Sequence, residues 1–474
     1  MTGLIEAKPM TERVPLIIPV ENQVRELDPK LLLALVAARR GFPTIIGNLR
    51  EIDLRIASFP TSVYLCKSMT ERNRHVFNIL IRLGHKIVTW DEEALVHLPD
   101  EIYYSRRLSP EVLRQLSHLF AWGEDNAELW RRYPGMPRDL PIHVTGNPRS
   151  DLLRPEIRPF YEAEAAEIRR EHGKFILVNT NFNHVNAFYA RQNLFVERIA
   201  GGPPRFGKAG VGMTVEFAEA LRDQKQALFE AFQTMIPALD RAFPGYTIVV
   251  RPHPTESPDV YKALAANCER VRVTNEGNVV SWLMATTALV HNGCTTGVEA
   301  FAMRIPAISY RPRIDERVDK GFYSLPHGVS HQCFDLDSLI GMLGEVIAGR
   351  LGAANGAERK ALFDRHMTGM EGPSACERIM DVVESMLGAD RGLPKTSIAD
   401  RALGWSHANG RRLLKRTLVK IPGFRARPGF YKHRYPYVPI ERVQEKLARF
   451  ARLLGDGPSA TVRELHEDVF WISP

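Results

Sequence analysis

The stretch Tyr246-Thr-Ile-Val-Val-Arg-Pro-His-Pro254 joins a short apolar run to a turn made rigid by two prolines. The run 246–250 predicts a strand, and residues 213–241 before it and 279–285 after it have helical spacing. Strands that alternate with helices form βαβ units, so this part of the chain is predicted to fold around a parallel sheet. Ligands bind at the carboxyl ends of such strands, which is where Arg251 to Pro254 are expected.

The alternation of strands and helices occurs twice along the chain. In the first series the strand-like runs are 14–20, 44–47, 62–67, 86–90, 118–123 and 142–147. In the second series they are 175–179, 246–250, 271–274, 288–291 and 307–310. The predicted fold class is therefore α/β, with two Rossmann-like domains at 14–150 and 151–387 after an N-terminal tail, residues 1–13.

Length and composition agree with two globular domains. The 474 residues are 44% hydrophobic and 25% charged, which excludes disordered, collagen-like and disulfide-scaffold proteins. Five scattered cysteines indicate a reducing compartment. The longest strongly apolar run, residues 31–38, is too short to cross a membrane. We therefore expect a cytoplasmic protein.

The net charge of +8 originates in a C-terminal extension, predicted at 388–474. Residues 401–450 contain 13 Lys and Arg against two acids, interleaved with Phe and Tyr. Such a segment favours contact with an anionic inner-membrane surface, which would make the protein peripheral there. Nucleic acid is not expected, because no RNA-binding signature accompanies the segment. A solvated face, or a strap that docks on the second domain, remains the alternative.

His253 is the first candidate for chemistry. Pro252 and Pro254 fix the backbone on both sides of it, so its ring is held in place beside Arg251. A rigid imidazole next to a guanidinium suits a leaving group that gains negative charge, such as a phosphate. The alternative is a turn whose histidine is satisfied by local hydrogen bonds.

A phosphate seat is predicted at His291-Asn292-Gly293-Cys294-Thr295-Thr296-Gly297, which lies between a strand and a helix. Free N–H groups and the positive end of the helix dipole favour an anion there, and the hydroxyls of Thr295 and Thr296 add donors. Glu299, one turn into the helix, is a candidate for a ribose diol. Helix capping by Thr295 is the alternative.

Carboxylates follow a strand of the first domain at Asp91-Glu92-Glu93. Crowded carboxylates raise the pKa of at least one of them, which makes a general base plausible. The alternative is an acidic, exposed helix start. Glu21, Arg25 and Glu26 follow the first strand and are predicted to lie on the acceptor side of the same cleft.

No metal site is predicted. His327, His331 and Cys333 lack an evident fourth ligand, so these residues are expected to be ordinary loop residues. Asp335-Leu-Asp337 resembles a metal-binding motif but precedes a helix, where a cap is expected. Gly202 to Lys208 fits the start of a nucleotide-triphosphate loop, but two prolines remove N–H donors that the loop needs.

The order of these motifs resembles the GT-B glycosyltransferases that use CMP-activated nonulosonic-type sugars, namely bacterial sialyltransferases and Kdo transferases. The stretches at Glu21 to Asp28, Thr145 to Asp151, Asn179 to Phe182 and His291 to Gly293 further resemble the bacterial family described as "surface carbohydrate biosynthesis protein". The likeness spans residues 14–385.

The resemblance implies a role for each matched residue. His253 would assist the departing CMP phosphate, residues 292–296 with Arg251 would bind the nucleotide phosphate, and Glu299 the nucleotide. Glu93, with Glu92 and Asp91 beside it, would supply the base or nucleophile. A CMP donor leaves as a monophosphate, so neither a metal nor another cofactor is implied. Two departures from the family pattern are Ala94 where the family has glycine and Cys294 where serine is commoner.

The resulting functional prediction is a glycosyltransferase of capsule or lipopolysaccharide synthesis. It would transfer a Kdo- or sialic-acid-like sugar from a CMP donor to a glycan acceptor, with a lipid-linked glycan among the expected acceptors. The alternatives on the same fold are a CDP-polyol phosphotransferase and a UDP-sugar epimerase. A non-catalytic assembly protein that binds a nucleotide or a lipid-linked glycan is the alternative from another class.

Overall fold

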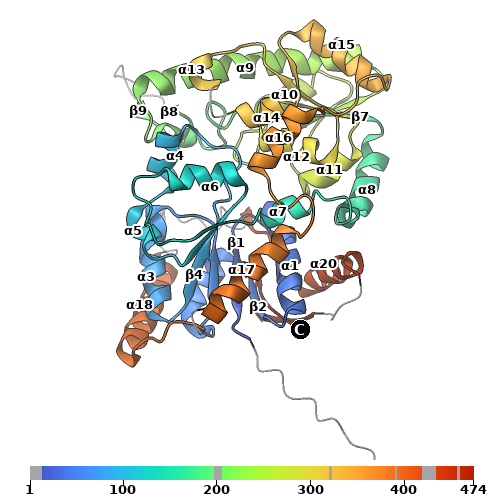
Figure 1. The fold of residues 1–474 in the computed structure, drawn as a ribbon. Helices are drawn as coiled ribbons and strands as arrows, with labels where there is room; N and C mark the ends of the chain where they lie inside the picture. The colour runs from blue at the N-terminus through green and yellow to red at the C-terminus, as the bar shows by residue number, and fades with distance from the viewer. Residues whose placement is uncertain (1–12, 197–204, 320–322, 390–391, 419–433, 456–459) are drawn as a thin grey trace, which may run out of the picture.

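The computed structural model describes residues 13–196, 205–319, 323–389, 392–418, 434–455 and 460–474. It has two large sheets of mainly parallel strands, each flanked by helices (Figure 1), and a two-stranded sheet formed by β8 Phe195–Val196 and β9 Arg205–Phe206. The predicted α/β class with two Rossmann-like domains is therefore confirmed.

The first sheet has eight strands in the order β15-β16-β2-β1-β3-β4-β5-β6. Their bounds are β1 Leu16–Val20, β2 Thr44–Asn48, β3 Val63–Cys66, β4 Lys86–Thr89, β5 His118–Ala121, β6 Ile142–Val144, β15 Thr461–His466 and β16 Val469–Ser473. Strands β1 to β6 are parallel and coincide with the six predicted runs. Continuous burial of β1, β3 and β4 agrees with a sheet covered on both faces.

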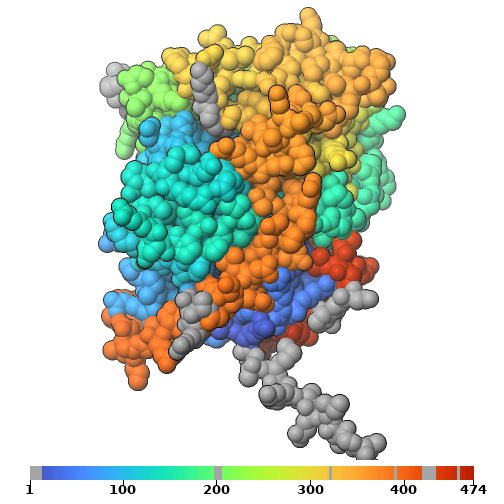
Figure 2. Space-filling view, in the orientation of Figure 1, coloured from blue at the N-terminus to red at the C-terminus, as the bar shows by residue number. Residues whose placement is uncertain are grey.

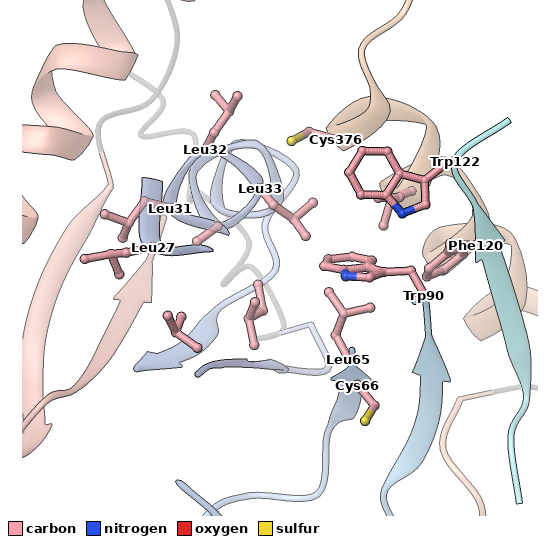
Figure 3. Packing of buried hydrophobic residues seen from close by; sticks show 14 of the residues in the cluster. Leu27, Leu31, Leu32, Leu33, Leu65, Cys66, Trp90, Phe120, Trp122 and Cys376 are labelled. Carbon is pink, nitrogen blue, oxygen red and sulfur yellow. The ribbon is translucent and has the colours of Figure 1, made fainter. Parts of the chain in front are cut away.

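Helices cover both faces of this sheet. They are α1 Gln23–Arg39, α2 Leu49–Arg55, α3 Arg74–Arg82, α4 Asp100–Arg107, α5 Pro110–Leu113, α6 Glu124–Arg131 and α7 Pro148–Asp151. The apolar run predicted as too short for a membrane lies in α1 and is buried. Figure 3 shows Leu33 of α1 in one core with Trp90, Phe120 and Trp122, which Cys376 from much later in the chain joins.

The second sheet has six parallel strands in the order β11-β10-β7-β12-β13-β14. Their bounds are β7 Phe175–Asn179, β10 Thr247–Arg251, β11 Val271–Val273, β12 Ala288–His291, β13 Ala307–Tyr310 and β14 His331–Cys333. The helices are α8 Glu162–His172, α9 Val215–Ala242, α10 Asp259–Ala265, α11 Val279–Ala285, α12 Thr295–Met303, α13 Glu316–Asp319, α14 Ser324–Gly328, α15 Leu336–Ile347 and α16 Ala357–His366. Strand β7 is central, between the two strands that carry the predicted motifs.

Helix α17, Ala375–Ala389, returns the chain to the first domain. Figure 2 shows α16 and α17, in orange, running down one face from the second unit onto the first. The carboxylate of Asp151 accepts the N–H groups of Ala375 (2.8 Å) and Cys376 (2.9 Å), which fixes the start of α17 against α7. The predicted second domain, 151–387, thus ends in a helix that packs on α1 and α7 of the first.

The C-terminal extension is part of the first domain. Helix α18, Ile398–Leu418, packs on α2 and α3, and α20, Ile440–Leu453, packs on α1. Strand β16 pairs antiparallel with β2, so closely that a Cβ on Gly47 would lie 2.0 Å from the Asp468 carbonyl oxygen. The alternative of a strap on the second domain holds only in part: the open strand edge belongs to the first domain, while α20 also reaches the start of the second, where Phe450 stacks on Phe160.

Part of the basic charge of the extension is used in this docking. Arg411 pairs with Asp53, Lys446 with Asp28 (2.7 Å) and Arg449 with Glu164 (2.7 Å). Much of the basic and aromatic stretch lies outside the described residues, namely Lys420, Phe424, Arg425, Arg427, Phe430, Tyr431 and Lys432. Among the helices that the structure describes, none has the length and apolar character of a membrane span.

Candidate functional site

His253 lies at the carboxyl end of β10 in a turn that fixes its ring. Its backbone N–H donates to the Thr180 carbonyl (3.1 Å), and its Nδ1 accepts the backbone N–H of Thr255 (3.2 Å). Because Nδ1 is an acceptor, the neutral ring carries its proton on Nε2. Burial lowers the pKa of His253 to about 4 and Arg25 contributes in the same direction, so the ring is neutral at pH 7. It therefore presents a fixed N–H donor.

Glu256, three residues after His253, ties this turn to the loop after β7. Its Oε2 accepts the Thr180 hydroxyl (2.9 Å), the Phe182 N–H (3.1 Å) and, more weakly, the His253 N–H (3.4 Å). Its Oε1 accepts the Tyr261 hydroxyl. The carboxylate is buried and positions both loops; sequence reasoning missed it because nothing in the motif marks which acid turns inward.

Arg251 points away from the predicted phosphate site. Its guanidinium donates to the carbonyls of Glu276 (2.6 Å) and Gly277 (3.2 Å) and lies 4.8 Å from the centre of the Trp282 ring. Burial lowers its pKa to about 9. We therefore assign Arg251 a structural role, namely holding the loop after β11.

The predicted phosphate seat is the N-terminus of α12. Cys294 is the residue before the helix and Thr295 is its first residue, so Thr295 does not cap it. The Thr296 hydroxyl pairs with the Cys294 thiol, whereas the Thr295 hydroxyl has no partner among the described residues. Gly293 has φ +91, and a Cβ there would lie 2.8 Å from His327. Thr295 and the first N–H groups of α12 are thus the donors available to an anion.

Buried amide oxygens without partners surround this seat. In the described part of the chain, Oδ1 of Asn179, Asn181, Asn183 and Asn292 makes no hydrogen bond. Asn179 to Asn183 follow the central strand β7 and lie between the His253 turn and α12. Buried polar atoms are normally satisfied, so these oxygens indicate a place for a polar ligand. The motif at Asn179 was visible in the sequence, but it carried no charge that suggested a role.

Glu299 lies where the two domains meet. Its Oε1 accepts Arg149 of α7 (2.9 Å), whose guanidinium lies 5.5 Å from the Trp122 ring centre, and its Oε2 has no described partner. Burial raises the pKa of Glu299, while Arg149 and Arg25 oppose that shift. The unpartnered oxygen leaves Glu299 able to accept a ligand hydroxyl.

Asp91 is part of the scaffold. It is fully buried, and its carboxylate accepts Tyr103 (2.8 Å) and the Arg107 guanidinium (Nε at 2.9 Å). Its carbonyl accepts the Trp122 indole N–H (2.8 Å). With its oxygens engaged, Asp91 has no capacity left for a substrate, so we assign it a structural role.

Glu92 and Glu26 belong to a buried network of matched charges. Lys30 donates to Glu26 (2.8 Å) and lies 3.6 Å from Glu92, while Lys67 donates to Glu26 (2.7 Å). The Trp90 indole donates to Glu92 Oε1 (2.9 Å), and Oε2 of Glu92 has no described partner. Burial opposes ionisation of Glu26, but Lys30 and Lys67 together lower its pKa.

Glu93 is the carboxylate that reaches the open side of this cluster. Its side chain is 57% exposed, and Arg25 donates to it at 2.7 Å. Arg25 lowers the pKa of Glu93 to about 2, so the carboxylate is ionised at neutral pH. The Glu93 N–H donates to the Asp91 side chain (3.2 Å) and Ala94 has no positive φ, so this turn needs no glycine.

Glu21 receives a residue from the C-terminal extension. Lys67 (2.6 Å) and Arg434 both pair with it, and its N–H donates to Glu26 (3.0 Å). Burial raises the pKa of Glu21, but Lys67 and Arg434 outweigh it and lower the pKa. The three predicted acceptor-side residues Glu21, Arg25 and Glu26 therefore lie together.

The structure brings part of the predicted site together across the two domains. Arg25 and Glu93 from the first domain are near enough to His253 of the second to shift its pKa. The assembled groups are an ionised carboxylate, a neutral N–H donor and a helix N-terminus, which suit displacement of an anionic leaving group by a hydroxyl. Arg251 and Asp91 do not take part.

The residues considered for metal binding have other partners, and they do not lie in loops as predicted, because His327 belongs to α14 and both His331 and Cys333 belong to β14. His327 Nδ1 lies 2.6 Å from Ser309 Oγ, His331 Nε2 lies 3.0 Å from the Gly352 carbonyl, and Cys333 donates to Asp335. The Asp335 side chain caps α15, as predicted. In the ranges that the structure describes, no group of three or more potential ligands lies together.

No protein-family model matches the chain, and no curated protein matches its sequence. Solved structures match in three dimensions. The wall teichoic acid polymerase TagF is 11% identical, with a TM-score of 0.50 over 80% of this chain and 90% of that one. The chain has a GT-B-type fold.

Two UDP-GlcNAc 2-epimerases have lower TM-scores. The enzyme of Methanocaldococcus jannaschii, solved with UDP-GlcNAc and UDP, is 12% identical, with a TM-score of 0.46 over 79% of this chain and 99% of that one. The enzyme of Neisseria meningitidis, bound to UDP-GlcNAc, is 12% identical, with a TM-score of 0.43 over 79% of this chain and 100% of that one. At these identities the likeness concerns the fold, and the surface carbohydrate family stays a prediction.

Proposed function

We propose that the protein is a metal-independent glycosyltransferase of surface polysaccharide synthesis that uses a CMP-activated, Kdo- or sialic-acid-like donor. The observation that carries the proposal is the neutral His253 ring, whose Nε2–H is fixed by the Thr255 contact to Nδ1 and whose pKa is affected by both Arg25 and Glu93. A hydrogen-bond donor held in this way stabilises a phosphate oxygen as that oxygen gains negative charge.

In this mechanism the acceptor hydroxyl oxygen bonds to the anomeric carbon, and the bond from that carbon to the phosphate oxygen breaks. The electron pair stays on the phosphate oxygen of CMP. The His253 Nε2–H and the N–H groups at the start of α12 donate hydrogen bonds to that oxygen. Glu93 accepts the hydroxyl proton or passes it to water. A carboxylate with a pKa of about 2 is a weak base, which suffices when bond breaking precedes attack, because the hydroxyl then becomes acidic.

Donor identity is tested by thermal-shift titration with CMP, CDP, UDP and GDP on wild type, Thr295→Val and Thr296→Val. We expect CMP alone to stabilise the protein, and Thr295→Val to weaken this more than Thr296→Val, whose hydroxyl is tied to Cys294. A preference for CDP would instead support the polyol phosphotransferase, and one for UDP the epimerase. No shift with any nucleotide would favour a non-catalytic assembly protein.

Catalysis is tested at His253. His253→Ala is expected to lower the transfer rate by about 10²- to 10⁴-fold without lowering the melting temperature. His253→Gln keeps an N–H donor and should retain more activity than His253→Ala. Equal activity of all three proteins would contradict the assigned role.

The acceptor is proposed to be a membrane-bound glycan, reached through α18. This helix exposes Trp405 (58%), Leu413 (69%) and Leu414 (59%) beside Arg412 and Arg416. Exposed apolar side chains next to cations suit the surface of an anionic bilayer. The protein is expected to sediment with phosphatidylglycerol vesicles but not with phosphatidylcholine vesicles, and the double variant Trp405→Ser, Leu413→Ser should stay in solution with both.

A further inference from the structure

Lys225 of α9 is a buried cation without a counter-ion. Its side chain has no exposed surface, and its Nζ donates to the Asn181 carbonyl (3.4 Å) and lies 4.2 Å from the centre of the Tyr323 ring. No described carboxylate forms an ion pair with it. A buried ammonium group without a paired anion is costly, so its retention calls for a compensating partner.

The amine lies behind the loop that leads into α12. Asn292 Nδ2 donates to the same Asn181 carbonyl (3.2 Å), and Asn292 is two residues before Cys294, at the start of the helix. A Cβ on Gly293 would lie 2.9 Å from the Tyr323 ring, against which Lys225 packs. Lys225 and the N-terminus of α12 therefore belong to one site.

The charged and titratable groups that face Lys225 leave its charge unmatched. They come from the β10 turn, the α12 start, α13, the β7 loop and α14, namely Glu256, Cys294, Asp319, His184 and His327. Glu256 is engaged by the two loops it joins, and Asp319 by Gln224 (2.9 Å) and Arg311 (3.1 Å).

The remaining neighbours carry no opposite charge at neutral pH. Burial lowers the pKa of His184 to about 3 and that of His327 to about 2, and it raises the pKa of the Cys294 thiol. Burial also lowers the pKa of Lys225 to about 8, against the opposing effect of Glu256. The ammonium form thus predominates at pH 7, and the described carboxylates near it are engaged by other residues.

Unpartnered oxygens next to the amine describe the rest of the ligand. Oδ1 of Asn181 and Oδ1 of Asn292 are buried without a described hydrogen-bond donor. An anion alone would leave both unsatisfied, whereas a ligand with an oxyanion and adjacent hydroxyls would satisfy the amine and the oxygens together. Arg251 cannot supply this cation, because it is turned toward Glu276.

We propose that Lys225 binds an oxyanion of the donor, while Asn181 and Asn292 accept hydroxyls of the same molecule. The inference rests on the proposed function for the identity of that donor. Two oxyanions of a CMP-activated sugar acid have the required chemistry: the nucleotide phosphate and the sugar carboxylate.

The test is calorimetric titration of the full chain as wild type, Lys225→Met and Lys225→Arg, with Arg222→Met as the control from the same helix. The ligands are CMP, cytidine, free Kdo and inorganic phosphate. If Lys225 meets the phosphate, Lys225→Met lowers CMP and phosphate affinity at least 10-fold and leaves cytidine unchanged. If Lys225 binds the carboxylate, Lys225→Met lowers the affinity for Kdo instead. Lys225→Arg restores binding in either case, and Arg222→Met matches wild type with every ligand.

Equal affinity of wild type and Lys225→Met for all four ligands would overturn the inference, even if CMP binds and the proposed function stands. Conversely, loss of phosphate or Kdo binding in Lys225→Met, with no CMP binding to wild type, would retain the oxyanion site and reject the nucleotide. Failure of wild type to bind any of the oxyanions would also overturn the inference.

Proton uptake gives a second readout that does not depend on how well Lys225→Met folds. At pH 8.5 an amine with a pKa of about 8 is mostly neutral, and an oxyanion that pairs with it draws a proton from the buffer. Titrations in two buffers of different ionisation enthalpy should show uptake in wild type and none in Lys225→Arg, which is always protonated. Equal uptake in both proteins would contradict the proposal.

Discussion

The carboxyl ends of the two sheets carry polar groups in opposite states. In the first domain the buried charges are already matched, as Glu26 is by Lys30 and Lys67 and Asp91 is by Arg107. In the second domain the amide oxygens after β7 and β12 lack partners among the described residues. The buried charges of the first surface are therefore largely paired without a ligand, whereas the amide oxygens of the second surface require one.

The largest expected difference between the two surfaces is their response to acid. Burial lowers the pKa of four histidines in the second domain to about 4 or below, namely His184, His253, His291 and His327. In the first domain burial lowers the pKa of His85 to about 4. The unfolded chain takes up a proton near pH 6.5 and the folded chain does not, so stability falls as pH drops from 6.5 to 4.

Each such histidine costs about 2 kcal/mol at pH 5, or about 8 kcal/mol for the second domain. The lowered pKa of Glu26 instead stabilises the first domain above pH 4.5, and this contribution is lost only below that pH. Hydrogen exchange measured at pH 5 should therefore show that the second domain opens before the first. Simultaneous opening of both domains would contradict the expected difference in their stability at acid pH.

The next effect concerns single side chains. Asp91→Asn leaves Arg107 beside a neutral group and should lower the free energy of unfolding by about 3–5 kcal/mol. Asn181→Ala removes an oxygen that bonds to nothing described and should change it by less than about 1 kcal/mol. Urea denaturation measures both, and an equal loss in the two variants would show that the two surfaces do not differ.

A ligand should act on one domain only. CMP at 100 times its dissociation constant is expected to stabilise the protein by about 2.7 kcal/mol. Slower hydrogen exchange should appear in the segments after β7, β10 and β12, and the interior of α1 should be unchanged. Protection confined to the first domain would contradict the proposed site.

The smallest change in stability is expected at Glu93. Because its pair with Arg25 is partly exposed, Glu93→Gln should alter the free energy of unfolding by less than about 1 kcal/mol. The same variant should lower the transfer rate at least 10-fold, whereas Glu111→Gln, an exposed acid distant from the site, should not. A Glu93→Gln enzyme with normal activity would leave Glu92 as the remaining acidic candidate.

The strands of both sheets were predictable because their signals are local. All eleven predicted strands occur, since each is a short apolar run between turn residues. Strands β14, β15 and β16 of the two large sheets were not predicted. Strand β15 is largely exposed, and β16 pairs with β2, which is some 400 positions away in the sequence. A single-sequence pattern holds no information about a partner at that distance.

Side-chain partners decide which predicted site residues face the cleft. Asp91 and Glu93 are equivalent in the sequence, and only the positions of Arg107 and Arg25 separate a scaffold carboxylate from an accessible one. The orientations of Arg251 and Lys225 likewise could not be predicted from the sequence. The arginine beside the histidine motif turns to a neighbouring loop, while the cation at the α12 loop comes from α9, a helix whose sequence carries no motif.

The pairing of β16 with β2 also fixes an order of events during synthesis. The edge of β2 in the first sheet is covered by residues 469–473 of β16. All six strands of the second sheet are made before them and pair among themselves. The second domain can therefore finish folding on the ribosome, while the domain translated first stays open along β2 until β16 has been made. During that interval the edge of β2 is exposed, and an exposed strand edge favours aggregation. A chaperone that prevents this aggregation would bind at β2.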